Sequence, residues 1–217
     1  MMTDSAHVFL DLDGTLTESG IGITRSVAHA LRELGYRVPD QARLDSMIGP
    51  SLWEGFAALG LPDDQLDDAV ALYRARYTTT GLFENRLYDG VADMLARLEG
   101  ATLCLATAKP IAYAAKITAH FGIAPYMTHQ FGSELDGTRS DKTDLIAHAL
   151  ARTGAAPARA VMVGDRSHDM IGALANGVTP VGAEWGYGSA AELRAAGCQH
   201  IAATPAQAAD MILEILA

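Results

Sequence analysis

The sequence predicts an α/β fold, in which a doubly wound parallel sheet has a small all-helical domain inserted after its first strand. An apolar run at residues 8–10 predicts that strand, and residues 21–80 then show helical spacing and no convincing strand. From about residue 100, short apolar runs alternate with helical segments. Such alternation indicates a Rossmann-like core, because crossover helices join parallel strands. We expect an α/β core of residues 1–16 and 86–217 and a helical domain at 17–85.

The first strand is followed by acidic residues. The apolar run at 8–10 is typical of a buried parallel strand, and Asp11 and Asp13 follow it directly. Gly14 permits the tight turn that comes next. Ligands of open α/β sheets bind outside the carboxyl ends of the strands, so both acids are candidate site residues.

The inserted domain is predicted to contain three helices. Apolar residues recur at spacings of three and four from Ile23 to Leu34, and Gly35 follows as a helix stop. Shorter patterns of the same kind span residues 52–59 and 66–77.

Strands and helices alternate through the rest of the chain. Five further strands are predicted, at residues 102–106, 127–131, 160–163, 179–182 and 199–201. Helices are predicted beside them, at residues 91–98, 111–121, 142–151, 170–175, 190–195 and 205–216.

Composition narrows the classes of function. With 49% hydrophobic and 19% charged residues the chain is expected to be a soluble globular protein. A formal net charge of −10 argues against a broad nucleic-acid or membrane surface, but allows a small phosphorylated metabolite as ligand. No signal peptide or membrane helix is recognised, so we expect a cytoplasmic protein in which Cys104 and Cys198 are reduced. The sequence does not decide between a monomer and a dimer.

Two separated acidic pairs predict a metal site. Asp165 and Asp169 follow a second apolar strand and Gly164, and would share one side of a helix if a helix began there. Carboxylates about 4 Å apart repel by on the order of 4 kcal/mol at an effective dielectric constant near 20. Four such anions at adjacent strand ends are most stable around a cation, and all-oxygen ligands suit Mg²⁺. The candidate metal ligands are therefore Asp11, Asp13, Asp165 and Asp169.

Two further residues suit a phosphate ligand. Thr107 ends a predicted strand shortly before Pro110, which we place in the first turn of a helix. Its hydroxyl and the adjacent backbone N–H groups could hold a phosphate oxygen, although capping a helix is the commoner role of threonine. Lys142 opens a predicted helix, where its charge opposes the helix dipole and so favours a functional role.

These residues resemble the four motifs of the haloacid-dehalogenase-like hydrolase superfamily. Residues 11–16 are similar to the first motif, Thr107 to the second, Lys142 to the third and residues 164–169 to the fourth. The inserted helices are similar to the small cap of that family.

Other stretches look like the phosphoglycolate-phosphatase-like branch of the superfamily. They lie at residues 106–110, 131–137 and 185–188. Ala108 departs from this branch, which often has asparagine at that position, so only a backbone contact to substrate is expected there.

The resemblance implies a phosphatase mechanism. Asp11 would attack the phosphorus to form an aspartyl-phosphate that water then hydrolyses. Asp13 would protonate the leaving oxygen and then take the proton of the water. Mg²⁺ would be held by Asp11, the main-chain carbonyl of Asp13 and Asp165.

The resemblance also implies the substrate contacts. Thr107 and Lys142 would neutralise or hydrogen-bond the phosphoryl oxygens and so join Asp11 and Asp13 as catalytic residues, and Asp169 would steady Lys142. In the cap, Ser26 and the turn Gly49-Pro50-Ser51 are further candidates. The substrate-binding set is Thr107, Ala108, Lys142 and, in the cap, Arg25.

The expected function is therefore that of a Mg²⁺-dependent phosphatase for a small phosphate monoester. Phosphoglycolate is the leading substrate, with 5′-nucleotides close behind. The presence of Asp13 favours phosphoryl transfer, because dehalogenase members of the superfamily lack this second acid. A phosphomutase with the same motifs and a catalytically idle binding module are the alternatives. The sequence contains neither HExxH nor GxxxxGK[ST], so no zinc-hydrolase site or P-loop is expected.

Overall fold

The computed structural model describes residues 5–49 and 51–217. The chain forms two compact units, one made of the residues up to Thr17 together with Leu87–Ala217, the other of Glu18–Arg86. The first unit contains the sheet, and the second is helical in its described part. The predicted fold class, a parallel α/β sheet with a helical insert after its first strand, is confirmed.

The α/β unit is built on a six-stranded parallel sheet with the order β3-β2-β1-β4-β5-β6. In β1, Phe9 pairs with Cys104 of β2 on one side and with Met162 of β4 on the other. The direction of winding reverses between β1 and β4, and ligands of such sheets bind at that point. The strands are β1 (His7–Leu10), β2 (Thr102–Pro110), β3 (His129–Ser133), β4 (Ala160–Gly164), β5 (Thr179–Ala183) and β6 (His200–Ala202).

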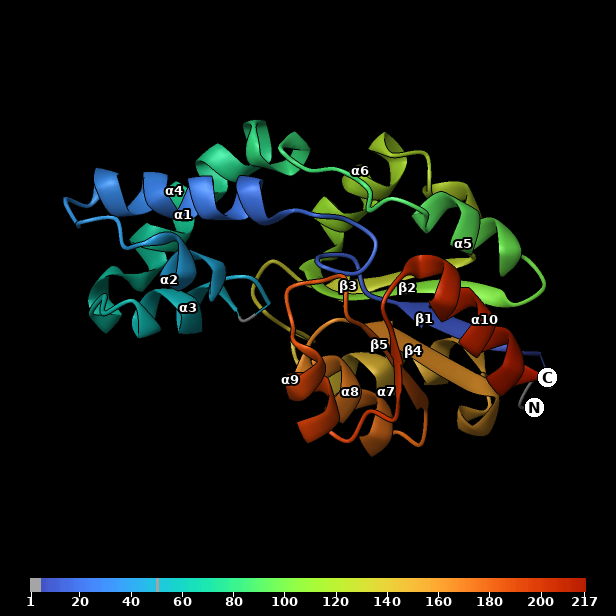
Figure 1. Cartoon of the computed structure of the whole chain (residues 1–217). Coiled ribbons are helices and arrows are strands. Elements are labelled where there is room, and N and C mark those ends of the chain that lie inside the picture. The colour runs from blue at the N-terminus through green and yellow to red at the C-terminus, as the bar shows by residue number, and fades with distance from the viewer. Residues whose placement is uncertain (1–4, 50) are drawn as a thin grey trace. The chain divides into compact units, whose positions relative to one another are not determined.

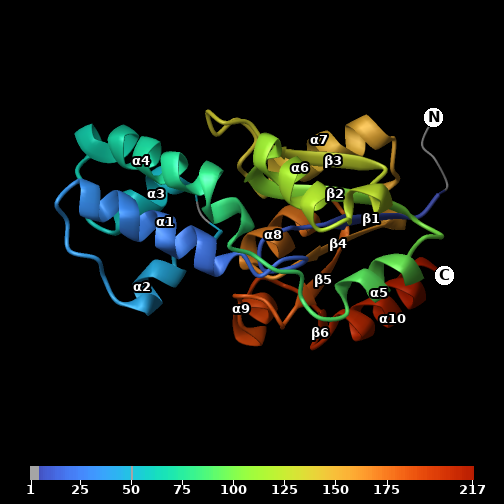
Figure 2. The same ribbon diagram turned by 90° about the horizontal axis from the view of Figure 1, so that it is seen from above.

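Helices cover both faces of this sheet (Figure 1, Figure 2). Helices α5 and α6 lie on one side of the strands, and α7 and α8 lie on the other. Helix α10 packs against α5, the edge strand β6 and its neighbour β5. The helices are α5 (Val91–Arg97), α6 (Ile111–His120), α7 (Lys142–Thr153), α8 (Ser167–Ala175), α9 (Ala190–Ala195) and α10 (Pro205–Leu216).

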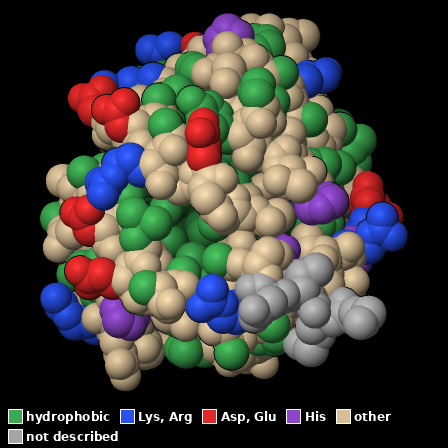
Figure 3. Space-filling model, turned by 90° about the vertical axis from the view of Figure 1, so that its right-hand side faces the viewer, with side chains coloured by type: hydrophobic (Ala, Val, Ile, Leu, Met, Phe, Trp, Pro, Cys, Tyr) green, Lys and Arg blue, Asp and Glu red, His purple; other side chains and the backbone are tan. Residues whose placement is uncertain are grey.

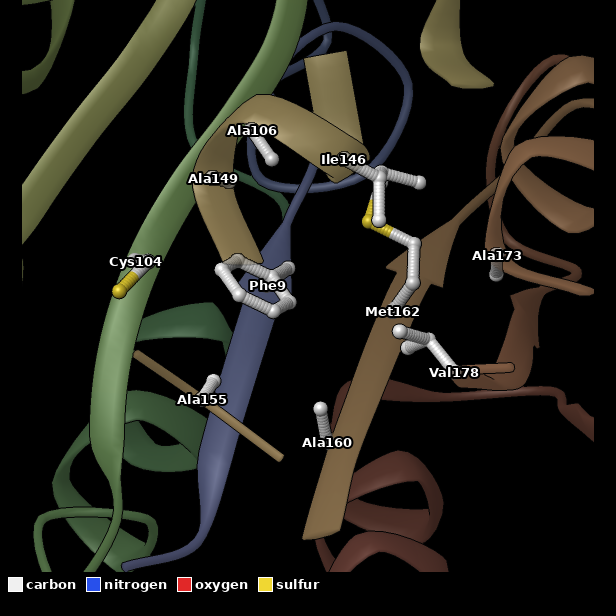
Figure 4. Close-up of a cluster of buried hydrophobic side chains, with 10 residues drawn as sticks. All are labelled: Phe9, Cys104, Ala106, Ile146, Ala149, Ala155, Ala160, Met162, Ala173 and Val178. Carbon is white, nitrogen blue, oxygen red and sulfur yellow. The ribbon is translucent and has the colours of Figure 1, made fainter. Parts of the chain in front are cut away.

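A core of small and medium-sized apolar side chains joins the sheet to α7 and α8. Figure 4 shows this cluster, to which β1 contributes Phe9, β4 contributes Met162 and α7 contributes Ile146. All three side chains are fully buried. Burial of a side chain of this size contributes about 1.5–3 kcal/mol. This packing fixes the positions of β1, β4 and α7 relative to one another. It therefore also fixes the positions of the residues that follow the two strands and of those that begin the helix.

The helical unit has one helix more than predicted in its described part. The additional helix, α2, is too short to show an apolar period, but Asp40 caps it by accepting a hydrogen bond from the Arg43 N–H at 3.0 Å. The helices are α1 (Gly20–Glu33), α2 (Gln41–Asp45), α3 (Leu52–Ala58) and α4 (Leu66–Thr79).

Several boundaries differ from the prediction. Strand β3 begins two residues late, because a 3₁₀ turn at Ala124–Tyr126 precedes it and pairing with β2 starts at His129. Strand β6 begins one residue late. Helix α8 begins at Ser167 rather than at residue 170, and Pro110 is the last residue of β2 rather than part of a helical turn. These boundaries are set by backbone hydrogen bonds, which the spacing of hydrophobic residues does not reveal.

No helix among the described residues is long and apolar enough to cross a bilayer. On the face shown in Figure 3, acidic and basic side chains are interspersed, without a gathering of lysine and arginine. That face therefore lacks the continuous positive surface that binds nucleic-acid backbones.

Candidate active site

Lys142 and Asp11 form the centre of the candidate site. The Asp11 N–H donates to the Val163 carbonyl at 3.0 Å, which extends the pairing of β1 with β4 by one residue. Lys142 is the first residue of α7, and its Nζ lies 2.8 Å from Asp11 Oδ1 and 2.7 Å from Asp169 Oδ1. The same nitrogen donates to the Ala106 carbonyl at 2.9 Å. The three charged side chains are buried and come from three separate parts of the chain.

The charges of these residues depend on one another. Burial tends to lower the pKa of Lys142, but Asp11 and Asp169 outweigh burial and raise this pKa above its usual value. Burial raises the pKa of Asp11, and Lys142 offsets only part of that rise. The pKa of Asp169 is lowered, because Lys142 and His168 outweigh the effect of burial. Lys142 is therefore a fixed positive charge at neutral pH.

Asp165 is a third buried carboxylate in the same place. One carboxylate oxygen from each of Asp11, Asp165 and Asp169 lies within 4.8 Å of the others. Burial, followed by the charges of Asp169 and Asp11, raises the pKa of Asp165 to about 8. When all three carboxylates are ionised, they exceed the charge of the Lys142 ammonium by two negative charges. A divalent cation balances this charge and oxygen ligands suit Mg²⁺, so these residues fit the predicted metal.

Asp165 lies before α8, which begins at Ser167, and therefore does not share a helix with Asp169. Loops position its carboxylate instead. Thr15 donates to Oδ1 at 3.2 Å, and the Tyr187 N–H donates to Oδ2 at 2.8 Å. A Cβ on Gly186 would lie 2.3 Å from the Asp165 Cβ, so the loop approaches this closely only with glycine. The Thr15 and Tyr187 contacts were missed, because a sequence pattern does not show which loops meet.

The carboxylate of Asp13 lies outside the three-carboxylate cluster. Its Oδ2 is 2.9 Å from the Nζ of Lys109, a residue for which the sequence predicted no role. Its Oδ1 is buried and has no hydrogen-bond partner among the described residues. The structure thus gathers the carboxylates of three of the four predicted metal ligands. A contribution of Asp13 through its main-chain carbonyl stays a prediction.

The predicted phosphate-binding residues lie at the carboxyl end of β2, next to β1. Thr107 is buried, and its Oγ1 accepts a hydrogen bond from the Lys109 N–H at 3.2 Å. The Ala108 carbonyl accepts a hydrogen bond from Ser133 Oγ at 2.7 Å. Their contact with substrate stays a prediction.

The cap candidates have partners within the helical unit. Arg25 Nη1 lies 2.8 Å from Glu84 Oε1, and Arg76 pairs with the same carboxylate. Ser26 Oγ accepts a hydrogen bond from Arg76 Nη1 at 3.1 Å. In the turn at 49–51, Pro50 lies outside the described residues. Binding of substrate by Arg25, Ser26 and this turn stays a prediction.

Comparison with known families decides the assignment of the chain. A family model described as haloacid dehalogenase-like hydrolase matches residues 8–183. This chain belongs to the haloacid dehalogenase-like hydrolase family. The resemblance inferred from the four motifs is confirmed, and the acidic cluster is that of a haloacid dehalogenase-like phosphatase with a site typical of magnesium.

Several relatives of this haloacid dehalogenase-like hydrolase have names that refer to phosphoryl transfer. The chain is 46% identical over 192 residues to a 5′-nucleotidase of Pseudomonas aeruginosa, covering 87% of each protein. It is 43% identical over 185 residues to the tyrosine-protein kinase PtkA of Mycobacterium tuberculosis, covering 84% of this chain and 63% of the kinase. The crystal structure of a predicted phosphatase from Clostridium acetobutylicum matches with a TM-score of 0.92 at 37% identity, covering 97% of this chain and 99% of that one.

Proteins named phosphoglycolate phosphatase are more distant relatives. Those of Colwellia psychrerythraea and Rhodospirillum rubrum are 25% and 33% identical to this haloacid dehalogenase-like hydrolase, over 83% of its length in each case. The predicted phosphatase class is thus supported, but the leading substrate is not. The 5′-nucleotide alternative has the stronger support from similarity.

Proposed function

We propose that this protein is a Mg²⁺-dependent phosphatase that hydrolyses 5′-nucleoside monophosphates through an aspartyl-phosphate. The observation on which the chemistry rests is the convergence of Asp11, Asp165, Asp169 and Lys142 at one edge of the sheet. The substrate class rests on the similarity to a 5′-nucleotidase.

In the first half-reaction Asp11 is the nucleophile. One of its carboxylate oxygens forms a bond to phosphorus while the bond between phosphorus and the 5′-oxygen breaks. Asp13 gives a proton to that 5′-oxygen, which leaves as an alcohol. The fixed charge of Lys142, 2.8 Å from Asp11 Oδ1, orients the nucleophile and balances the negative charge that gathers beside it.

In the second half-reaction Asp13 acts as a base. Its carboxylate takes a proton from a water molecule, whose oxygen forms a bond to phosphorus. The bond between Asp11 and phosphorus breaks, which frees inorganic phosphate and regenerates the carboxylate. Thr107, at the neighbouring strand end, is positioned by its hydrogen bond with the Lys109 N–H and supplies a hydroxyl for a phosphoryl oxygen.

The acidic residues would hold the metal. Asp11, Asp165 and the main-chain carbonyl of Asp13 would be the ligands, and Asp169 would support the site through Lys142. Mg²⁺ bound there would neutralise charge on the phosphoryl group and orient it.

Metal dependence gives the first prediction. We expect EDTA to abolish phosphate release and added Mg²⁺ to restore it. Mg²⁺ at about 100 times its Kd should also stabilise the fold by about 2.7 kcal/mol, measured by urea unfolding. Asp165→Asn should lose both responses because it removes a buried ligand, whereas Asp93→Asn, on the exposed face of α5, should keep them. Full turnover in EDTA would contradict the metal assignment.

The same variant has a second readout that does not depend on turnover. Because folding raises the pKa of Asp165 from 3.8 to about 8, the folded protein binds the extra proton and loses stability as pH rises between these values. In EDTA, the wild type should therefore lose more stability than Asp165→Asn between pH 4 and pH 8. If the stability of the two proteins changed equally with pH, burial of the Asp165 carboxylate would not oppose folding.

The substrate proposal is tested by measuring phosphate release from a panel of esters in Mg²⁺. We expect 5′-nucleoside monophosphates to exceed phosphoglycolate in kcat/KM by about tenfold or more, a difference that a few pocket contacts supply. A preference for phosphoglycolate would overturn the substrate class while leaving the mechanism. Isomer formation without phosphate release would show a mutase, and no turnover of any ester would indicate an idle member of the family.

A further inference from the structure

We propose that Lys109 is the positioning residue for Asp13, and that a bulge in β2 places it there. This inference rests on the proposed function, because it assumes that Asp13 gives a proton to the leaving oxygen. The supporting observations are the ion pair, the irregular pairing of β2 with β3 and the hydrogen bonds that stabilise it.

The ion pair is largely shielded from solvent. Lys109 Nζ lies 2.9 Å from Asp13 Oδ2, and the two side chains are 6% and 15% exposed. An exposed lysine would lose little by keeping its ammonium in water, so burial beside a carboxylate indicates a specific partner. The chain has only two other lysines: Lys142, at the centre of the site, and Lys116, on the exposed side of α6.

The backbone of β2 is irregular at Lys109. Thr107 is paired with Gly132 of β3, whereas Pro110 is paired with the next residue, Ser133. Two residues of β2 therefore bulge out between these pairs, and Lys109 is one of them. Bulges beside active sites change the direction in which a side chain points, and here that side chain meets Asp13.

Contacts on both sides hold the bulge in shape. The Lys109 N–H donates to Thr107 Oγ1 at 3.2 Å, and Ser133 Oγ donates to the Ala108 carbonyl at 2.7 Å. A Cβ on Gly132 would lie 2.7 Å from the Lys109 carbonyl oxygen, so the close approach of β3 needs glycine. Thr107, Gly132 and Ser133 thus fix the backbone of the bulge, and with it the direction in which the Lys109 side chain leaves the strand.

The ion pair leaves the two oxygens of Asp13 in different environments. Oδ2 is engaged by Lys109, while Oδ1 is buried and has no hydrogen-bond partner in the described part of the chain. Oδ1 is thus the atom left to give and take the proton. As it gives the proton, the carboxylate gains negative charge, which the Lys109 ammonium stabilises.

This role differs measurably from binding the phosphoryl group. A nucleotide must release a ribose alkoxide and needs the proton from Asp13, whereas 4-nitrophenyl phosphate releases a stable phenolate and needs it far less. The ratio kcat/KM reports on the steps up to departure of the leaving group. A residue that positions Asp13 should therefore affect the two esters unequally, and one that binds phosphate or maintains the fold should affect them equally.

The test compares Lys109→Met with the wild type on a 5′-nucleoside monophosphate and on 4-nitrophenyl phosphate in Mg²⁺. We expect kcat/KM to fall by about 100-fold for the nucleotide and by less than about 10-fold for the nitrophenyl ester, as for a displaced acid–base group. Lys109→Arg, which keeps the charge, should recover part of the loss. Lys116→Met is the matched control and should leave both values unchanged.

Ser133→Ala removes the hydrogen bond to the Ala108 carbonyl and so loosens the bulge while keeping the lysine. It replaces Lys109→Met as the test if that variant fails to fold. It should reduce the nucleotide value more than the nitrophenyl value, by a smaller factor. Equal losses on the two esters, or an unchanged nucleotide value in Lys109→Met, would overturn the role of Lys109. A wild type that hydrolyses neither ester would overturn the proposed function instead.

Discussion

Replacing Asp11 with asparagine should reduce turnover by at least about 10⁴-fold, as expected when a nucleophile is removed. An amide cannot form the proposed aspartyl-phosphate, although it has nearly the shape of the carboxylate. The measurement is phosphate release from a 5′-nucleoside monophosphate and from 4-nitrophenyl phosphate, because a better leaving group should not rescue a missing nucleophile.

Stability should respond to Asp11→Asn in the opposite sense from activity. Burial raises the pKa of Asp11, so at neutral pH folding is opposed by the charge that the substitution removes. The melting temperature in EDTA should therefore be no lower than that of the wild type. Asp93→Asn controls for the loss of one acidic group on the surface. Retained turnover in a folded Asp11→Asn protein would refute the covalent mechanism.

Replacing Lys142 with methionine should destabilise the fold by about 3–5 kcal/mol, the usual cost of leaving a buried charge without its partner. Lys142 is 2% exposed and is the cation between Asp11 and Asp169, so its removal leaves two buried carboxylates facing each other. Since a domain of this kind is stable by only about 5–15 kcal/mol, the effect is large and is measurable by urea unfolding in EDTA.

A second substitution shows whether the loss of stability in Lys142→Met comes from unbalanced charge or from poorer packing. In Lys142→Met with Asp169→Asn, one of the two carboxylates that Lys142 contacts is removed as well, so the double variant should be more stable than Lys142→Met alone. Lys116→Met, on an exposed helix face, should change stability little. If the double variant is less stable still, the loss is due to packing and not to the unbalanced charge.

The linear pattern predicts the elements of this fold better than their ends. The apolar run at 8–10 and the acids after it identify β1, because a strand buried on both faces must be apolar. Helix α2 was not predicted, since its five residues make fewer than two helical turns and show no repeating hydrophobic spacing. The start of β3 at His129 depends on its register with β2, which is a property of two distant segments.

The residues of the candidate site were also predicted only in part. Asp11, Asp165, Asp169 and Lys142 were predicted together, because motifs at strand ends meet at one edge of a parallel sheet. No role was predicted for Lys109, although it lies in the stretch 106–110 that resembles a branch of the superfamily, because its contact with Asp13 joins the ends of two different strands.

By itself, the sequence determined the order of most strands and helices and the acids that end them, since these follow from hydrophobic period and from residue types at strand ends. The phosphatase class followed from the resemblance of four motifs to the haloacid-dehalogenase-like hydrolase superfamily. Only the tertiary structure decided which oxygen meets which nitrogen: Lys109 with Asp13, Lys142 between two carboxylates, and the Tyr187 N–H on Asp165. The physical reason is that such contacts depend on bulges, loop approach and strand register, which arise when segments far apart in the chain pack against each other.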